Sequence, residues 1–94
     1  MEDKINQLND NLPEISVSEL SNQVKFTMET AFGRVRVRGE ISRPMKAASG
    51  HLYLTLKDKK SVLDGVCWKG NAKRLTIQPE EGMEVICRGK ITTY

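Results

Sequence analysis

Residues 34–42 alternate between charged and apolar side chains with a period of two. Arg34, Arg36 and Arg38 are separated by single valines. Successive side chains of a β-strand point to opposite faces of a sheet, so this spacing predicts a strand that Pro44 stops. We expect the valines to face a core and the three arginines to share the opposite, outer face.

Three further segments are typical of strands. Residues 51–57 alternate as strictly as the first segment, 61–68 carry apolar residues on both faces, and 83–93 form one long run. The residues expected to face inward are Leu52, Leu54, Leu56, Leu63, Cys67, Val85, Cys87 and Ile91. A helical turn is predicted at 70–75 and a tight turn at 79–82, so three meandering strands are followed by a short helical turn and then by the long last strand.

A helix is predicted before the first strand. Ser16 and Glu19 have the spacing of a capping box, in which each side chain satisfies a free backbone N–H of the other residue. Apolar residues then recur every three or four positions, which predicts a helix over 17–32 that Gly33 ends. Residues 1–14 are polar and are expected to form a flexible lead-in, with one domain over 15–94.

Length and composition narrow the class of protein. The chain has 94 residues and a formal net charge of +3, which suits one small domain with a modest core. No apolar run approaches the roughly 20 residues of a membrane span, and the polar N-terminus is not a secretory signal, so we expect a cytoplasmic protein with no membrane partner. In that compartment Cys67 and Cys87 are expected to be buried free thiols.

The outward-facing residues suggest a partner. Cations alternate with aromatic rings there, and this mixture fits single-stranded nucleic acid, whose phosphates pair with cations and whose bases stack on rings. The candidate binding residues are Arg34, Arg36, Arg38, Tyr53, Thr55, Lys57 and Trp68. The alternative is a solvated strand face, with Trp68 covering a core edge and His51 an ordinary surface residue.

Catalysis finds little support in the sequence. One histidine and no clustered carboxylates leave no convincing catalytic set, and the two cysteines lack the paired spacing of a zinc site. The glycines before and within the first strand lack the Gly-Lys-Ser/Thr ending of a phosphate-binding loop. We therefore predict no catalytic residue, no metal site and no cofactor in this chain.

Two blocks, Gly39-Glu40-Ile41-Ser42 and the run from Gly50 to Asp58 (GHLYLTLKD), carry a family resemblance. With the order of the strands around them, they resemble the N-terminal OB-fold domain of the large subunit of bacterial exonuclease VII, over about residues 15–94. The resemblance implies a mainly β Greek-key barrel with a leading N-terminal helix. An OB fold has five strands and four are predicted here, so we expect a truncated barrel whose open edges favour self-association or strand exchange.

The resemblance also implies a function. The parent enzyme would hydrolyse single-stranded DNA in the cytoplasm, together with a small helical subunit and with catalytic residues outside this segment. Tyr53 occupies the position at which related anticodon-binding domains stack an aromatic ring on a base. Two other readings stay open: a tRNA- or RNA-binding module, favoured by the run Leu52–Asp58, and a subunit-interaction domain using an open sheet edge.

Overall fold

The computed structural model of the protein describes residues 11–93, in two compact units. One unit contains the chain up to Gly33 together with the segment that begins at Ile91, and the other is Arg34–Lys90. Most of the predicted lead-in, residues 1–10, lies outside the described residues. The boundary predicted between lead-in and domain stays a prediction.

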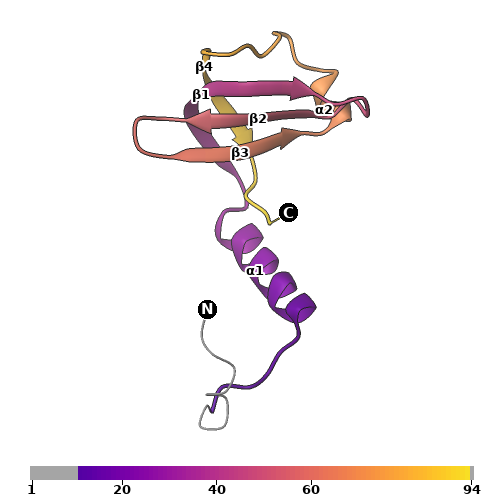
Figure 1. The fold of residues 1–94 in the computed structure, drawn as a ribbon, viewed down its shortest axis with the longest axis vertical. Coiled ribbons are helices and arrows are strands. Elements are labelled where there is room, and N and C mark those ends of the chain that lie inside the picture. The colour runs from indigo at the N-terminus through magenta and orange to yellow at the C-terminus, as the bar shows by residue number, and fades with distance from the viewer. Residues whose placement is uncertain (1–10, 94) are drawn as a thin grey trace. The chain divides into compact units, whose positions relative to one another are not determined.

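Helix α1, Val17–Ala31, dominates the first unit (Figure 1). Its capping box is confirmed, because Ser16 N–H donates to Glu19 Oε1 (2.9 Å) and Glu19 N–H donates to Ser16 Oγ (3.0 Å). These hydrogen bonds favour the carboxylate form, so they lower the pKa of Glu19. The helix ends one residue earlier than predicted, and Phe32 rather than Gly33 occupies the C-cap, with its N–H donating to Met28 O (2.9 Å).

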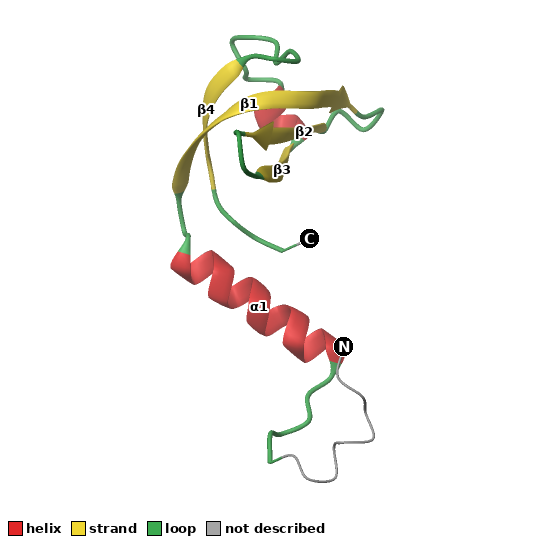
Figure 2. Ribbon diagram, turned by 60° about the vertical axis from the view of Figure 1, so that its left-hand side comes forward, coloured by secondary structure: helices red, strands yellow, loops and turns green. Residues whose placement is uncertain are grey.

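The second unit is a four-stranded antiparallel sheet in the order β3-β2-β1-β4. Its elements are β1 Val35–Lys46, β2 Leu52–Lys57, β3 Val62–Cys67, the short helix α2 Lys69–Ala72, and β4 Glu84–Gly89. A leading helix followed by this open sheet confirms the predicted mainly β fold, an OB-type arrangement without a fifth strand among the described residues. Figure 2 shows β1 curving strongly along its length.

Strand β1 is longer than predicted, because Pro44 does not stop it. The register shifts by one residue between Ser42, which lies opposite Thr55, and Met45, which lies opposite Tyr53. Such a β-bulge leaves residues unpaired, and a proline without an N–H is tolerated there. Arg43 within the bulge has a positive φ of 53°, and its N–H donates to Glu81 Oε1 (2.7 Å).

Strand β4 is shorter than predicted. It ends at Gly89, and Ile91 is not an inward-facing strand residue, because its N–H donates to Phe32 O (3.4 Å) within the helical unit. Thr92 Oγ1 also donates to Glu29 Oε2 (2.6 Å) in that unit. These contacts hold the last described residues beside the end of α1 instead of extending the sheet.

The core of the sheet is small. Ile41, Leu52 and Leu56 are buried, whereas Leu54 is half-buried and Leu63, although it lies opposite Leu56, is 43% exposed. The inner face is therefore only partly covered within the sheet unit.

The partly covered inner face also changes the prediction for the cysteines. Cys67 and Cys87 are free, as predicted, but half-buried instead of buried. Partial burial raises the pKa of both thiols, and the neighbouring Cys67 raises that of Cys87 further. Thiols with raised pKa values stay protonated at neutral pH, which makes them weak nucleophiles and weak metal ligands.

Strands β3 and β4 are the two edges of the sheet. An edge strand presents unpaired backbone N–H and C=O groups that can pair with another chain. Apolar side chains accompany these groups, because Val62 on β3 is 71% exposed and Ile86 on β4 is 49% exposed. Both edges thus combine free hydrogen-bonding groups with apolar surface.

We expect the chain to self-associate through these edges as its concentration rises, which sedimentation velocity would measure. Val62→Lys should weaken the association, because a charge on an edge strand opposes pairing. Val17→Lys adds the same charge at an 83% exposed position on α1 and is the matched control. A monomer at all concentrations, or an association that only the control weakens, would contradict the prediction.

Candidate nucleic-acid interface

Strand register defines an outer face of the sheet. Residues directly opposite each other in antiparallel strands lie on one face, and alternate residues along a strand share it. Starting from Arg36 and following the pairs, the outer face consists of Arg36, Arg38, Glu40, Ser42 and, beyond the bulge, Met45 on β1, Tyr53, Thr55 and Lys57 on β2, Val62, Asp64 and Val66 on β3, and Glu84, Ile86 and Arg88 on β4.

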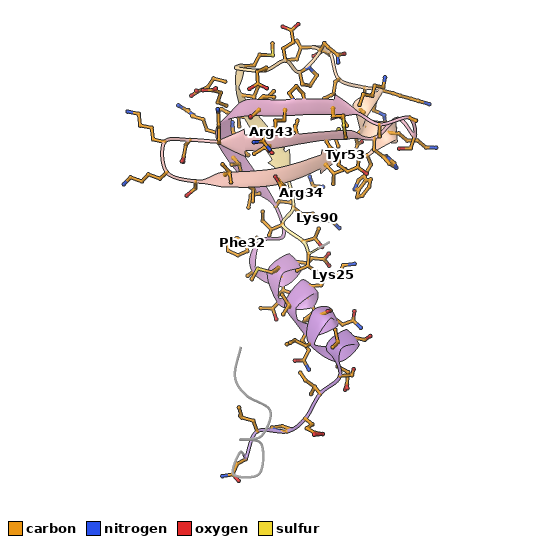
Figure 3. The ribbon with its side chains drawn as sticks, in the orientation of Figure 1. Lys25, Phe32, Arg34, Arg43, Tyr53 and Lys90 are labelled. Carbon is orange, nitrogen blue, oxygen red and sulfur yellow. The ribbon has the colours of Figure 1, made fainter. Side chains whose placement is uncertain are left out.

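One end of the outer face is cationic. Arg36 lies opposite Arg88 and Arg38 lies opposite Ile86, where β1 pairs with β4 beyond the end of β2. Arg34 lies just before β1, and all four arginines are exposed (Figure 3 labels Arg34). Arg88 was not among the predicted residues, although the alternation that turns Cys87 inward also turns Arg88 outward.

The middle of the outer face is acidic, because Glu40, Asp64 and Glu84 outnumber Lys57. Lys57 Nζ lies 3.8 Å from Glu40 Oε2, and Glu40 also lies opposite Glu84 in the register. Thr55 Oγ1 donates to Asp64 Oδ1 (3.0 Å). Two of the predicted binding residues, Thr55 and Lys57, are therefore already engaged by carboxylates of the same face.

The other end of the outer face is aromatic and apolar. Tyr53 is half-buried and lies opposite both Met45 of β1 and Val66 of β3 (Figure 3). Trp68, just after β3, is 46% exposed. This end of the face therefore carries apolar and aromatic side chains.

His51 packs against Trp68 at the aromatic end of the face. The two rings meet edge to face with centroids 5.0 Å apart and an interplanar angle of 87°. Lys69 N–H donates to His51 Nδ1 (3.0 Å), so the imidazole presents Nδ1 as an acceptor and carries its proton on Nε2. The first turn of α2 thereby orients the histidine, and the histidine orients the tryptophan.

The arginines and the aromatic rings share a face but do not lie beside each other. Arg38 and Met45, the β1 neighbour of Tyr53, are seven positions apart, which is roughly 23 Å of extended strand. The acidic middle of the face lies between them. The outer face therefore offers two separate kinds of contact, electrostatic at one end and stacking at the other.

Within residues 11–93 no group of three or more histidine, cysteine, aspartate or glutamate side chains is placed to hold a metal ion. In the same part of the chain no helix has the length and apolar character needed to cross a membrane.

The fold and its interface define a class of nucleic-acid-binding domain. The sequence model of the family described as OB-fold nucleic acid binding domain matches residues 15–94, and the chain belongs to this family. Segments of proteins named exodeoxyribonuclease 7 large subunit are similar to it. The identity is 61% over 84 residues for Rhodospirillum centenum and 58% over 85 residues for Erythrobacter litoralis, which confirms the predicted resemblance.

The similarity covers most of this chain but a small part of each relative. It includes 89% of the chain and 16% of the Rhodospirillum protein, and 90% of the chain and 18% of the Erythrobacter protein. A Caulobacter vibrioides relative is 55% identical over 84 residues, with 17% of its length covered. The chain therefore spans about a sixth of the length of the curated relatives it matches.

We expect ¹⁵N NMR to find the His51 ring in the form protonated at Nε2, because Nδ1 accepts the Lys69 N–H. Lys69→Pro removes this donor at the first position of α2, where proline is tolerated. The variant should show a mixture of tautomers, whereas Lys69→Ala should keep the Nε2–H form. An Nδ1–H ring in the unmodified protein would contradict the geometry.

Proposed function

We propose that this domain binds single-stranded DNA for an exodeoxyribonuclease and guides the strand toward catalytic residues outside this segment. The segment itself is then non-catalytic, and the whole enzyme works in the cytoplasm with a small subunit. The names of the relatives and the OB-fold family support this assignment. The observation that carries it is the outer face, which combines exposed arginines with Tyr53, a half-buried ring between Met45 and Val66.

Each end of the outer face has its own task in this proposal. Arg34, Arg36 and Arg38 neutralise backbone phosphates and release counterions, which favours any sequence alike. Tyr53 stacks on a base, and Trp68 offers a second ring nearby. Neither contact reads base edges, so binding tolerates every sequence, as a non-specific nuclease requires.

The middle of the face contributes less. Lys57 is paired with Glu40 and Thr55 with Asp64, so a phosphate would have to compete with a carboxylate for either side chain. These carboxylates also repel the backbone of the strand. We therefore assign Thr55 and Lys57 the supporting role of holding the face together between its two binding ends.

The double variant Arg36→Gln, Arg38→Gln should weaken binding to a short single strand and flatten its salt dependence. Each lost phosphate contact lowers the slope of log affinity against log salt by about 0.7, so the slope should fall by about 1.4. Fluorescence anisotropy over a salt series measures it. The control Lys59→Gln, Lys60→Gln removes equal charge from the turn between β2 and β3, and an equal effect there would refute a localised interface.

Tyr53→Ala should weaken binding by about 1–3 kcal/mol, the value of one base stacked on an aromatic ring. Tyr53→Phe keeps the ring and should retain most of the affinity in the same titration. If both variants bind equally well, stacking at this position is not part of the interface. A ribonucleotide strand of the same sequence, titrated in parallel, would bind more tightly if the domain were an RNA module.

A further inference from the structure

The cationic end of the sheet contains an open hollow of about 360 Å³. Three guanidinium-bearing residues line it, Arg34, Arg36 and Arg88, with Val35 and Gly89 completing the wall. We call this site the arginine hollow. Arg38 lies one outward position further along β1 and is not part of its lining.

The arginine hollow concentrates unpaired positive charge. Arg36 and Arg88 are direct cross-strand neighbours, a position in which Cβ atoms lie about 4.5–5.5 Å apart and like charges destabilise a sheet. Within residues 11–93 no carboxylate forms an ion pair with any of the three arginines. An anion seated between them would relieve this repulsion.

The chemistry of the guanidinium group narrows the choice of anion. Its planar fork binds phosphate oxygens in pairs, and arginine is favoured wherever planar recognition of phosphate matters. An internal phosphodiester carries a single negative charge, whereas a phosphomonoester carries about −1.5 to −2 at neutral pH and offers three acceptor oxygens. Three arginines around one hollow match the second group better than the first.

We propose that the arginine hollow binds the terminal phosphate of a DNA strand. This inference rests on the proposed function, and it adds Arg88 to the interface. The hollow lies where β1 begins, so a strand held there by its end has the length of β1 before it reaches Tyr53. A contact of this kind would place a strand end at one fixed position on the domain.

The test compares three unlabelled oligonucleotides of one sequence as competitors of an internally labelled strand: unphosphorylated, 5′-phosphorylated and 3′-phosphorylated. We expect one terminal phosphate to tighten binding about tenfold, the value of a charge-assisted hydrogen-bonded contact. Arg88→Gln should abolish this preference. Arg88→Lys, which keeps the charge without the fork, should restore overall affinity but only part of the preference.

Arg38→Gln is the matched control, because it removes the same charge from the same face outside the hollow. It should lower the affinity for all three oligonucleotides by the same factor, so the ratio of their affinities stays unchanged. If the three bind equally to the unmodified protein, or if Arg38→Gln abolishes the preference as fully as Arg88→Gln, the arginine hollow is not a terminal-phosphate site, while the proposed function stands. If none of the three binds, the proposed function fails as well.

Discussion

The structure depends on strand β1, which forms antiparallel pairs with two different strands along its length. β1 pairs with β4 from Val35 to Glu40 and with β2 from Glu40 to Lys46, so its middle must pass between two neighbours. Gly39 makes the crossing point compact, because a Cβ there would lie 3.1 Å from Leu56 Cβ and 3.4 Å from Lys57 O. Ile41 follows as the most buried side chain, 2% exposed.

The segment before β4 then fixes the crossing in place. Ile41 N–H donates to Met83 O (2.7 Å), and Gly82 N–H donates to Ile41 O (2.8 Å). Two residues further along β1, the Arg43 N–H bonds the Glu81 carboxylate at the bulge. The sheet can therefore curve at the bulge without losing the pairing that holds Tyr53 beside Met45.

The alternation of polar and apolar residues predicted four strands and the outward arginines, and the spacing of Ser16 and Glu19 predicted the helix cap. These patterns could not reveal the bulge, because a bulge depends on how β1 pairs with β2 and on a carboxylate 38 positions away at Glu81. Alternation also cannot show how the strands are aligned with one another. It therefore predicts the arginines and Tyr53 on one face, but only the register shows that they lie at opposite ends of it. The apolar strand segments around the two cysteines predict buried thiols, whereas the partly open inner face leaves both half-buried.

The separation of the two ends has an energetic consequence for the proposed interface. Exposed arginines act at long range and are screened by salt, so they speed encounter with a polyanion as well as contacting its phosphates. Tyr53, held between Met45 and Val66, loses less conformational freedom on stacking than a free side chain would, so its contact favours slow release. Because the acidic middle of the face contributes little, a ligand gains from both ends only if it spans them. The second contact then forms at a high effective concentration, and length rather than base sequence becomes the property that the domain selects.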